Sequence, residues 1–320
     1  MSSALHLKGP CPLCAGSSAC VCSDDIKSYF DLVDKCRTGI VARWDDLDPI
    51  ETDQVSCAIS ELTTLASGNG PKANYLLALA FTKGEGVERD DVEAEKFMLR
   101  AANLEVVAAQ LNMGFICAKK ARELSASSEK QGEDEACAVA WFEKAMNQGD
   151  VAAALNLGLL HEQKGRRAES FRYLQKAAEG GHARAQHRLG LLFFEGVLPG
   201  GVEQSDANAA TWWKKAVAQG NLDAHCSLGC LHLQGRGVKQ SDAEAGKLFE
   251  AAAEKGHAGC QFNLAFFYTE GRGVERSEPT ARYLLELAAA QGHSSAQAML
   301  LELSRGAPPP TVVDARPTVK

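Results

Sequence analysis

Two consecutive stretches decide the fold: LGCLHLQGRGVKQSDAEAGKLFEAAAEKGH at residues 228–257 and LAFFYTEGRGVERSEPTARYLLELAAAQGH at residues 264–293. They align without a gap at an offset of 36 residues. Self-similarity at such a period is typical of repeat proteins, in which each unit buries its apolar face only against its neighbours. The sequence therefore predicts a repeat array rather than a domain with one central core.

Related repeats continue toward the N-terminus, and glycines mark the ends of the later ones: Gly149, Gly181, Gly220, Gly256 and Gly292. We expect six repeats and a closing helix over 294–303, with the repeats at 71–105, 106–149, 150–181, 182–220, 221–256 and 257–292. The second repeat carries about eight extra residues, which we place in a loop within the polar stretch 121–135. The third is about four residues short, which predicts a tight turn between its helices.

Each repeat contains the pattern of two helices. Apolar residues recur at helical spacing in a helix A, as at Ala224, Leu228 and Leu231, and in a helix B, as at Ala245 and Phe249. A G-x-G-V motif follows helix A, and its glycines can take the positive φ that ends a helix. A small residue also recurs after the conserved leucine, where it would let two helices approach closely: Ala78, Gly114, Gly158, Gly190, Gly229 and Ala265.

The pattern A-x-x-x-L-G-x-x-Y/F-x-x-G-x-G-V, followed by A-x-x-W/F-x-x-A-A-x-x-G, resembles the Sel1-like repeat family, which is related to the tetratricopeptide repeats. The resemblance covers about residues 73–303. It implies an all-α fold, a right-handed α-solenoid superhelix of antiparallel helix pairs. It also implies a non-enzymatic scaffold or adaptor that binds a protein or peptide partner.

The resemblance further implies that a partner binds the concave, inner face of helix A. Two of the three rows of residues on this face are largely apolar, so they form a groove for a peptide or helix, or they pack between adjacent repeats. The residue before the conserved leucine is often Asn, which could bond a ligand backbone or a neighbouring repeat. The candidate contact residues are Tyr75, Leu79, Phe115, Asn156, Leu159, His187, Arg188, Leu191, Phe194, Cys226, Cys230, Phe262, Asn263 and Phe266.

The flanks of the array differ from it in composition. Residues 1–23 form a Cys-rich segment that we expect to be flexible, and residues 304–320 form a Pro-rich tail that we expect to be disordered. Residues 24–70 contain two expected helices, 24–38 and 51–67, that cap the array; the second would serve as helix B of an incomplete first repeat.

Four cysteines lie close together near the N-terminus: Cys11, Cys14, Cys20 and Cys22. A C-x2-C turn is half of a zinc site, but the C-x-C pair and the short spacer are unlike known zinc ribbons. Zinc binding, redox pairing, lipid attachment and a segment without metal all remain open. Cys226, Cys230 and Cys260 are interpreted as small buried hydrophobes.

No catalytic constellation is visible in the sequence. The motif beginning at His161 fails to complete H-E-x-x-H, and a G-x-S-x-G nucleophile elbow is missing. Ser127 and Lys130 fit S-x-x-K without the companion motifs. A β-lactamase-like activity, claimed for secreted relatives, would need paired cysteines and a nucleophile with its base. We therefore expect a protein that is not an enzyme and has no cofactor.

Composition limits which classes of partner and which cellular compartments are expected. The net charge is −7 and basic runs are missing, which disfavours nucleic acid as a partner. No apolar stretch is long enough to span a membrane, and the first residues lack the features of a signal or transit peptide. We expect a cytoplasmic protein. The alternative is a Cys-rich metal- or redox-handling repeat protein, which the resemblance would place in mitochondria.

Overall fold

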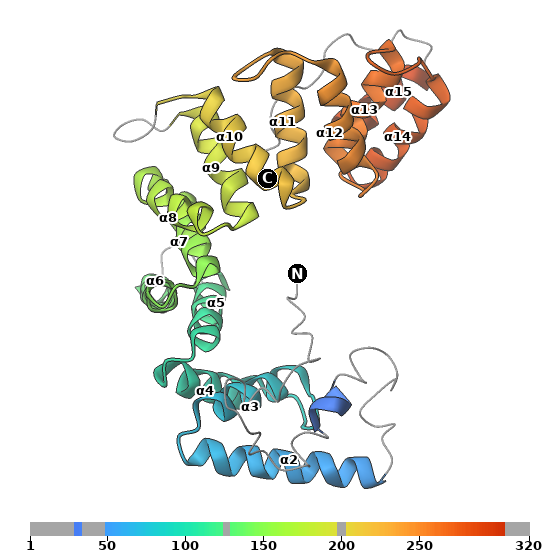
Figure 1. Cartoon of the computed structure of the whole chain (residues 1–320). Coiled ribbons are helices and arrows are strands. Elements are labelled where there is room, and N and C mark those ends of the chain that lie inside the picture. Colours follow the sequence, from blue (N-terminus) through green and yellow to red (C-terminus); the bar gives the residue numbers. More distant parts are fainter. Residues whose placement is uncertain (1–28, 34–48, 124–128, 197–202, 305–320) are drawn as a thin grey trace, which may run out of the picture. The chain divides into compact units, whose positions relative to one another are not determined.

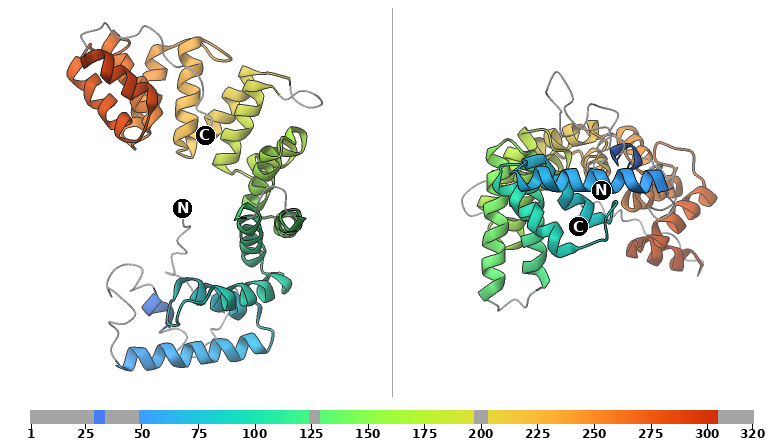
Figure 2. Two further views of the ribbon diagram at one scale, coloured as in Figure 1. Left: turned by 180° about the vertical axis from the view of Figure 1, so that it is seen from behind. Right: turned by 90° about the horizontal axis from the view of Figure 1, so that it is seen from below.

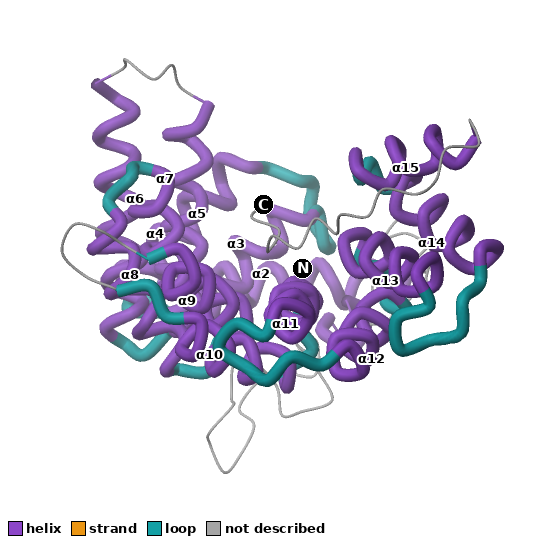
Figure 3. Tube along the Cα trace, turned by 90° about the horizontal axis from the view of Figure 1, so that it is seen from above, coloured by secondary structure: helices purple, strands orange, loops and turns teal. Residues whose placement is uncertain are grey.

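A computed structural model describes residues 29–33, 49–123, 129–196 and 203–304. Within these ranges all regular structure is helical (Figure 3). The helices are α2 (Pro49–Ser67), α3 (Pro71–Lys83), α4 (Asp91–Asn103), α5 (Val107–Glu123), α6 (Glu129–Asn147), α7 (Val151–Gln163), α8 (Arg167–Glu179), α9 (Ala183–Glu195), α10 (Asp206–Ala218), α11 (Leu222–Gln234), α12 (Asp242–Ala253), α13 (Ala258–Glu270), α14 (Glu278–Ala290) and α15 (Ser294–Ser304).

Each repeat forms one antiparallel helix pair, in which α3, α5, α7, α9, α11 and α13 are the A helices. The two helices of a repeat lie side by side, as α9 and α10 or α13 and α14 do (Figure 1 and Figure 2). The predicted all-α solenoid of helix pairs is thereby confirmed. The chain divides into two compact units, an N-terminal unit of residues 1–153 and a C-terminal unit of residues 154–320.

The conserved glycine of helix A makes room for helix B. A Cβ added at Gly190 would lie 2.3 Å from Nε1 of Trp213, and one added at Gly229 would lie 2.5 Å from Cε1 of Phe249. Gly114 and Gly158 face Phe142 and Leu174 in the same way. The prediction that small residues permit close helix approach is confirmed.

The two glycines of G-x-G-V have different roles. Gly235 ends α11 in the left-handed conformation, with φ 66° and ψ 27°. Gly237 also has a positive φ, and an added Cβ would lie 2.3 Å from the carbonyl carbon of Asp206, at the start of α10 in the preceding repeat. Between them, Arg236 donates to both carboxylate oxygens of Asp206, at 2.8 and 2.9 Å. The loop after helix A therefore docks on the helix B before it.

The second repeat is longer than 36 residues and the third is shorter, and the structure accommodates the two differences in different ways. The third repeat has the predicted tight turn, because only residues 164–166 separate α7 from α8. The loop predicted for the second repeat is wrong in extent, since α5 and α6 are 17 and 19 residues long and take up most of 121–135. Glu, Lys and Gln are strong helix formers, so this polar stretch continues both helices into solvent.

The N-terminal helix α2 takes the place of a helix B, as the sequence indicates. Nδ2 of Asn74 donates to the carbonyl of Ala66 in α2 at 3.2 Å, the bond that Gln110 makes to Ala102 one repeat later. Of the helix expected over 24–38, residues 29–33 are described and are helical. The segments 1–23 and 305–320 lie outside the described residues.

Candidate protein-interaction site

The predicted inner face of helix A is partly open in the N-terminal unit. Tyr75 and Leu79 on α3 are half-buried, and Phe115 on α5 is 43% exposed. Nδ2 of Asn112 donates to Oη of Tyr75 at 3.4 Å, which joins α5 to α3. Burial raises the pKa of Tyr75 and the bond from Asn112 opposes that change, so the phenol stays protonated at neutral pH. This part of the face is neutral, aromatic and accessible.

Phe115 is supported from behind by a buried aromatic ring. Its ring packs edge-on against Phe142, with the centroids 5.4 Å apart. Phe142 is buried against Gly114, the small residue that precedes Phe115. The exposed ring is thus held on a rigid base, so the side chain of Phe115 would lose little conformational entropy on binding a partner.

A second group of candidates lies where the third and fourth repeats meet in the C-terminal unit. Asn156 and Leu159 on α7 are half-buried. Nη1 of Arg188 on α9 lies 3.6 Å from Oε1 of Glu162 on α7. The side chain of Arg188 is largely buried, so this ion pair joins the two repeats and leaves little of the guanidinium for a partner.

Most of the predicted face in the C-terminal unit is buried. The side chains there pack between adjacent helices, as in the cluster that joins Cys226 and Cys230 to Phe249 and Phe267. Burial favours the self-packing alternative over a groove for His187, Leu191, Cys226, Cys230, Phe262, Asn263 and Phe266. The interpretation of Cys226, Cys230 and Cys260 as buried small side chains agrees with this packing.

Phe194 is half-buried beneath an arginine. The guanidinium carbon of Arg236 lies 4.4 Å from the centre of its ring, and the ring of Trp213 packs on it at 5.8 Å. Because Arg236 is also bound to Asp206, the arrangement is a cation–π stack within the array.

His187 is a buried imidazole kept neutral by its surroundings. Its Nε2 lies 3.2 Å from Oγ of Ser227 in the next repeat. Desolvation lowers the pKa of His187 to about 4; Asp223 and Cys226 oppose that shift, whereas Arg188 and His257 reinforce it. His187 is therefore uncharged at neutral pH and acts as a packing and hydrogen-bonding group.

The polar residue before the conserved leucine bonds to the preceding repeat. Besides Asn112 with Tyr75 and Ser227 with His187, Nδ2 of Asn263 lies 3.6 Å from Sγ of Cys226. These contacts favour inter-repeat bonding, the second alternative for this position, over recognition of a ligand backbone.

A row of glutamines that the sequence argument missed also joins the repeats. Nε2 of Gln186 donates to the carbonyl of Ala178, and its Oε1 accepts from Nε2 of Gln219 at 2.8 Å. The same clasp recurs with Gln110 and Gln148, and with Gln261 and Gln291. Recurrence of Gln at the fourth position of helix A was the available signal.

Several predicted features fall outside the described residues, namely Cys11, Cys14, Cys20, Cys22 and Ser127. Cys117 and Cys137 lie side by side as thiols, and burial together with this contact raises the pKa of Cys117 to about 12. Over the described part of the chain, no helix combines the length and the apolar character that crossing a membrane requires.

Solved structures share this architecture. One is c5321, a protective antigen of uropathogenic Escherichia coli with an SLR fold, at 30% identity and a TM-score of 0.67 over 79% of this chain and 53% of that one. Another is a Sel1 repeat protein from Oxalobacter formigenes, at 23% identity and a TM-score of 0.61 over 83% of this chain and 97% of that one. The second likeness concerns the fold alone.

Comparisons of sequence agree with the comparisons of structure. Chitin synthase regulatory factor 3 of Schizosaccharomyces pombe is 28% identical over 185 residues, which are 55% of this chain and 19% of that protein. This chain therefore spans only a small part of that relative. The model of the Sel1 repeat family matches residues 71–106, 107–150, 151–182, 183–221, 222–257 and 258–293. With six matched repeats folded as helix pairs, the chain belongs to the Sel1 repeat family.

Proposed function

We propose that this chain is a non-enzymatic adaptor that binds a protein or peptide partner through the inner face of helix A in its N-terminal unit. The single observation that carries the proposal is Phe115, an aromatic ring that is 43% exposed where its counterparts in the C-terminal unit are buried or half-buried. Tyr75 and Leu79 would complete an apolar contact surface beside it.

The chemistry of this surface selects the class of partner. Large aromatic side chains held on a rigid base are the residues that most often dominate binding energy at protein interfaces. An amphipathic helix or an extended peptide with an apolar side chain would cover Phe115. The net charge of −7 disfavours nucleic acid.

One comparison also supports an adaptor. The S. pombe relative is named as a regulatory factor of chitin synthase.

The cytoplasm is the compartment that we propose. Cys117 and Cys137 lie close enough for their side chains to interact, so their redox state reports the compartment, because a reducing environment would keep both as thiols. Counting alkylated cysteines in protein taken directly from cells would test this, and a bridge between these two would contradict it.

Selection from a phage-displayed library of random peptides tests the proposed function. The full chain should enrich peptides with apolar anchors, and Phe115→Asp should weaken their binding by roughly tenfold or more, because truncating a hot-spot aromatic costs about 2 kcal/mol or more. Tyr283→Asp is the matched control, since Tyr283 is a 61% exposed aromatic on α14, a helix B.

The two variants separate the outcomes. Circular dichroism should first show that Phe115→Asp keeps its helical content. Loss of binding in Phe115→Asp with binding retained in Tyr283→Asp supports the proposal. Peptides that bind both variants equally, or a library that yields no binder, would contradict it.

A further inference from the structure

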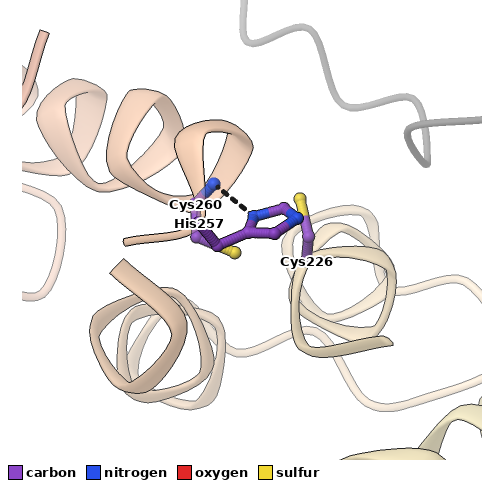
Figure 4. Close-up of side chains that lie close together, drawn as sticks. All are labelled: Cys226, His257 and Cys260. Carbon is purple, nitrogen blue, oxygen red and sulfur yellow. Dashed lines mark hydrogen bonds between the residues drawn. The ribbon is translucent and has the colours of Figure 1, made fainter. Parts of the chain in front are cut away.

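The junction of the fifth and sixth repeats brings two cysteines and a histidine together. Cys226 lies on α11, His257 immediately precedes α13, and Cys260 lies in the first turn of α13 (Figure 4). One ligand atom from each, two thiol sulfurs and an imidazole nitrogen, lie within 4.8 Å of one another. Both cysteines are buried, and the side chain of His257 is 15% exposed.

The hydrogen bonds of His257 fix its tautomer. The backbone N–H of Cys260, which can only donate, points at Nδ1 at a distance of 3.1 Å. Nδ1 is therefore unprotonated, and Nε2 carries the proton toward Oδ1 of Asp223 at 3.2 Å. A histidine that donates to a carboxylate through Nε2 is oriented as in carboxylate–histidine–zinc sites, where the other ring nitrogen binds the ion. In this structure the lone pair of Nδ1 accepts from the N–H of Cys260.

The next repeat shows that the fold does not require ligands at these positions. At an offset of 36 residues, Cys226, His257 and Cys260 correspond to Phe262, His293 and Ala296. There the histidine also accepts from a backbone N–H, that of Ala296, at 3.3 Å, and it stacks on Phe262 with the ring centroids 4.9 Å apart. The repeat geometry thus gathers these three positions, and at the junction of the fifth and sixth repeats they carry two thiols and an imidazole.

The surroundings of the three side chains also leave room for a metal ion and place a carboxylate beside it. A Cβ added at Gly259 would lie 3.2 Å from Cε1 of His257 and 3.6 Å from Sγ of Cys226, so glycine leaves the imidazole room to adjust. Asp223 is about half exposed, which opens the cluster to solvent on that side. Oδ1 of Asp223 lies 3.2 Å from Nε2 of His257, so a carboxylate stands directly beside the imidazole ring.

We propose that Cys226, His257 and Cys260 form a zinc site that joins the fifth and sixth repeats. Zinc prefers thiolate and imidazole ligands in tetrahedral geometry, where two sulfurs lie about 3.8 Å apart, so small side-chain rotations suffice. When the ion binds, Nδ1 of His257 coordinates it and gives up the hydrogen bond that it accepts from the backbone N–H of Cys260. The bond from Nε2 to Asp223 keeps the ring oriented. Binding releases two thiol protons to solvent, and the two thiolates balance the charge of Zn²⁺.

Zinc binding by the full chain tests the site, in a background that removes the N-terminal cysteines by Cys11→Ser, Cys14→Ser, Cys20→Ser and Cys22→Ser. The protein is reduced, stripped with a chelator and titrated with Zn²⁺ against a chromophoric competitor. A parallel titration with Co²⁺ reports thiolate coordination through its absorption bands. We expect one zinc per chain and a thiolate–cobalt spectrum.

Three variants distinguish the ligands from their surroundings. Cys260→Ala should lose the site and still fold, because Ala occupies this position in the neighbouring repeats as Ala224 and Ala296. Asp223→Asn should weaken binding by about 10- to 100-fold, the cost of losing an outer partner of a ligand histidine. Cys230→Ala removes a neighbouring buried thiol outside the group and should leave zinc affinity unchanged.

The outcomes that overturn the site are equally specific. They are a background protein that retains no zinc, a Cys260→Ala variant that binds it as well as the background does, or a disulfide between Cys226 and Cys260 in protein isolated from cells. Circular dichroism of each variant confirms that a lost site does not reflect an unfolded chain.

Discussion

At the scale of single residues, each conserved glycine within helix A is required by one close contact with a side chain of helix B. Gly190 lies against Trp213, which is fully buried and donates from Nε1 to the carbonyl of His187 at 3.0 Å. The sequence predicts the small residue from its periodic recurrence. The recurrence of Gln at the fourth position of helix A is a signal for the glutamine clasps, but it does not identify their partners, which are a carbonyl and a second Gln that folding brings alongside.

Gly190→Ala should destabilise the protein by about 1 to 2 kcal/mol. Overpacking a buried contact costs about 1–3 kcal/mol, and the better helix propensity of Ala returns up to about 1 kcal/mol. Gly132→Ala on α6 is the control, because an added Cβ there meets nothing within 4 Å; it should raise stability slightly. Urea unfolding followed by circular dichroism measures both, and a Gly190→Ala midpoint equal to wild type would contradict the close-contact explanation.

His187 should make the stability of the C-terminal unit depend on pH. Its pKa is about 4 in the folded protein and about 6.5 when unfolded, so the unfolded chain takes up the proton first as the pH falls. The stabilisation is complete above about pH 6.5 and is lost progressively down to about pH 4. At about 1.4 kcal/mol per pH unit, the loss at pH 5 is roughly 2 kcal/mol.

Urea midpoints at pH 7 and pH 5, with a chelator present, measure this loss. His187→Gln keeps a polar group near Ser227 and should flatten the dependence. The pKa of His187 can be read directly from the NMR shift of its imidazole Cε1 proton. A value near 6.5 in the folded protein would show that burial does not control this group.

At the scale of elements, the loop after helix A packs on helix B of the preceding repeat. Two glycines at the same position of consecutive loops make it possible to measure how much this contact contributes to stability. Gly237 and Gly273 occupy the same position in consecutive loops, with φ of 64° and 68°. An added Cβ lies 2.3 Å from the backbone of Asp206 at Gly237, but 3.8 Å from the backbone of Asp242 at Gly273. The two sites differ chiefly in how closely the loop approaches helix B.

Gly273→Ala should cost about 1–2 kcal/mol, the price of a left-handed conformation with a side chain. Gly237→Ala bears the same cost and must also move the loop off Asp206, so we expect at least about 1 kcal/mol more. Thermal and urea unfolding of the two variants checks this. Equal losses would mean that the loop does not depend on its contact with the preceding repeat.

The sequence predicts helix pairs well, because both the apolar spacing and the capping residues recur. It misjudges the second repeat, where the polar residues from Glu129 onward belong to a solvated helix rather than a loop. It also leaves the inner face undecided. Phe115 and Phe266 occupy the same position of helix A in the second and sixth repeats, yet Phe115 is 43% exposed and Phe266 is 5% exposed. That difference arises from the neighbouring helices, which local periodicity does not describe.

At the scale of the whole molecule, the core of the C-terminal unit is a series of small clusters. One groups Trp213 with residues of α9 and α11, another groups Phe249 with α11 and α13, and a third groups Leu285 with α13 and α15. Within each unit, helices that follow one another in the chain pack together, as α3 and α4 or α13 and α14 do. Stability in such an array is approximately a sum of repeat and nearest-neighbour contributions, so a local defect should remain local.

Hydrogen exchange measured by mass spectrometry tests this locality with Gly237→Ala. The defect lies between the fourth and fifth repeats, so exchange should speed up most in α10 and α11, which meet at the loop. Protection in α14 and α15 and in α3 and α4 should change little, because their clusters do not include the damaged contact. A uniform loss of protection along the chain would instead indicate that the array unfolds in one cooperative step, and the additive description of its stability would fail.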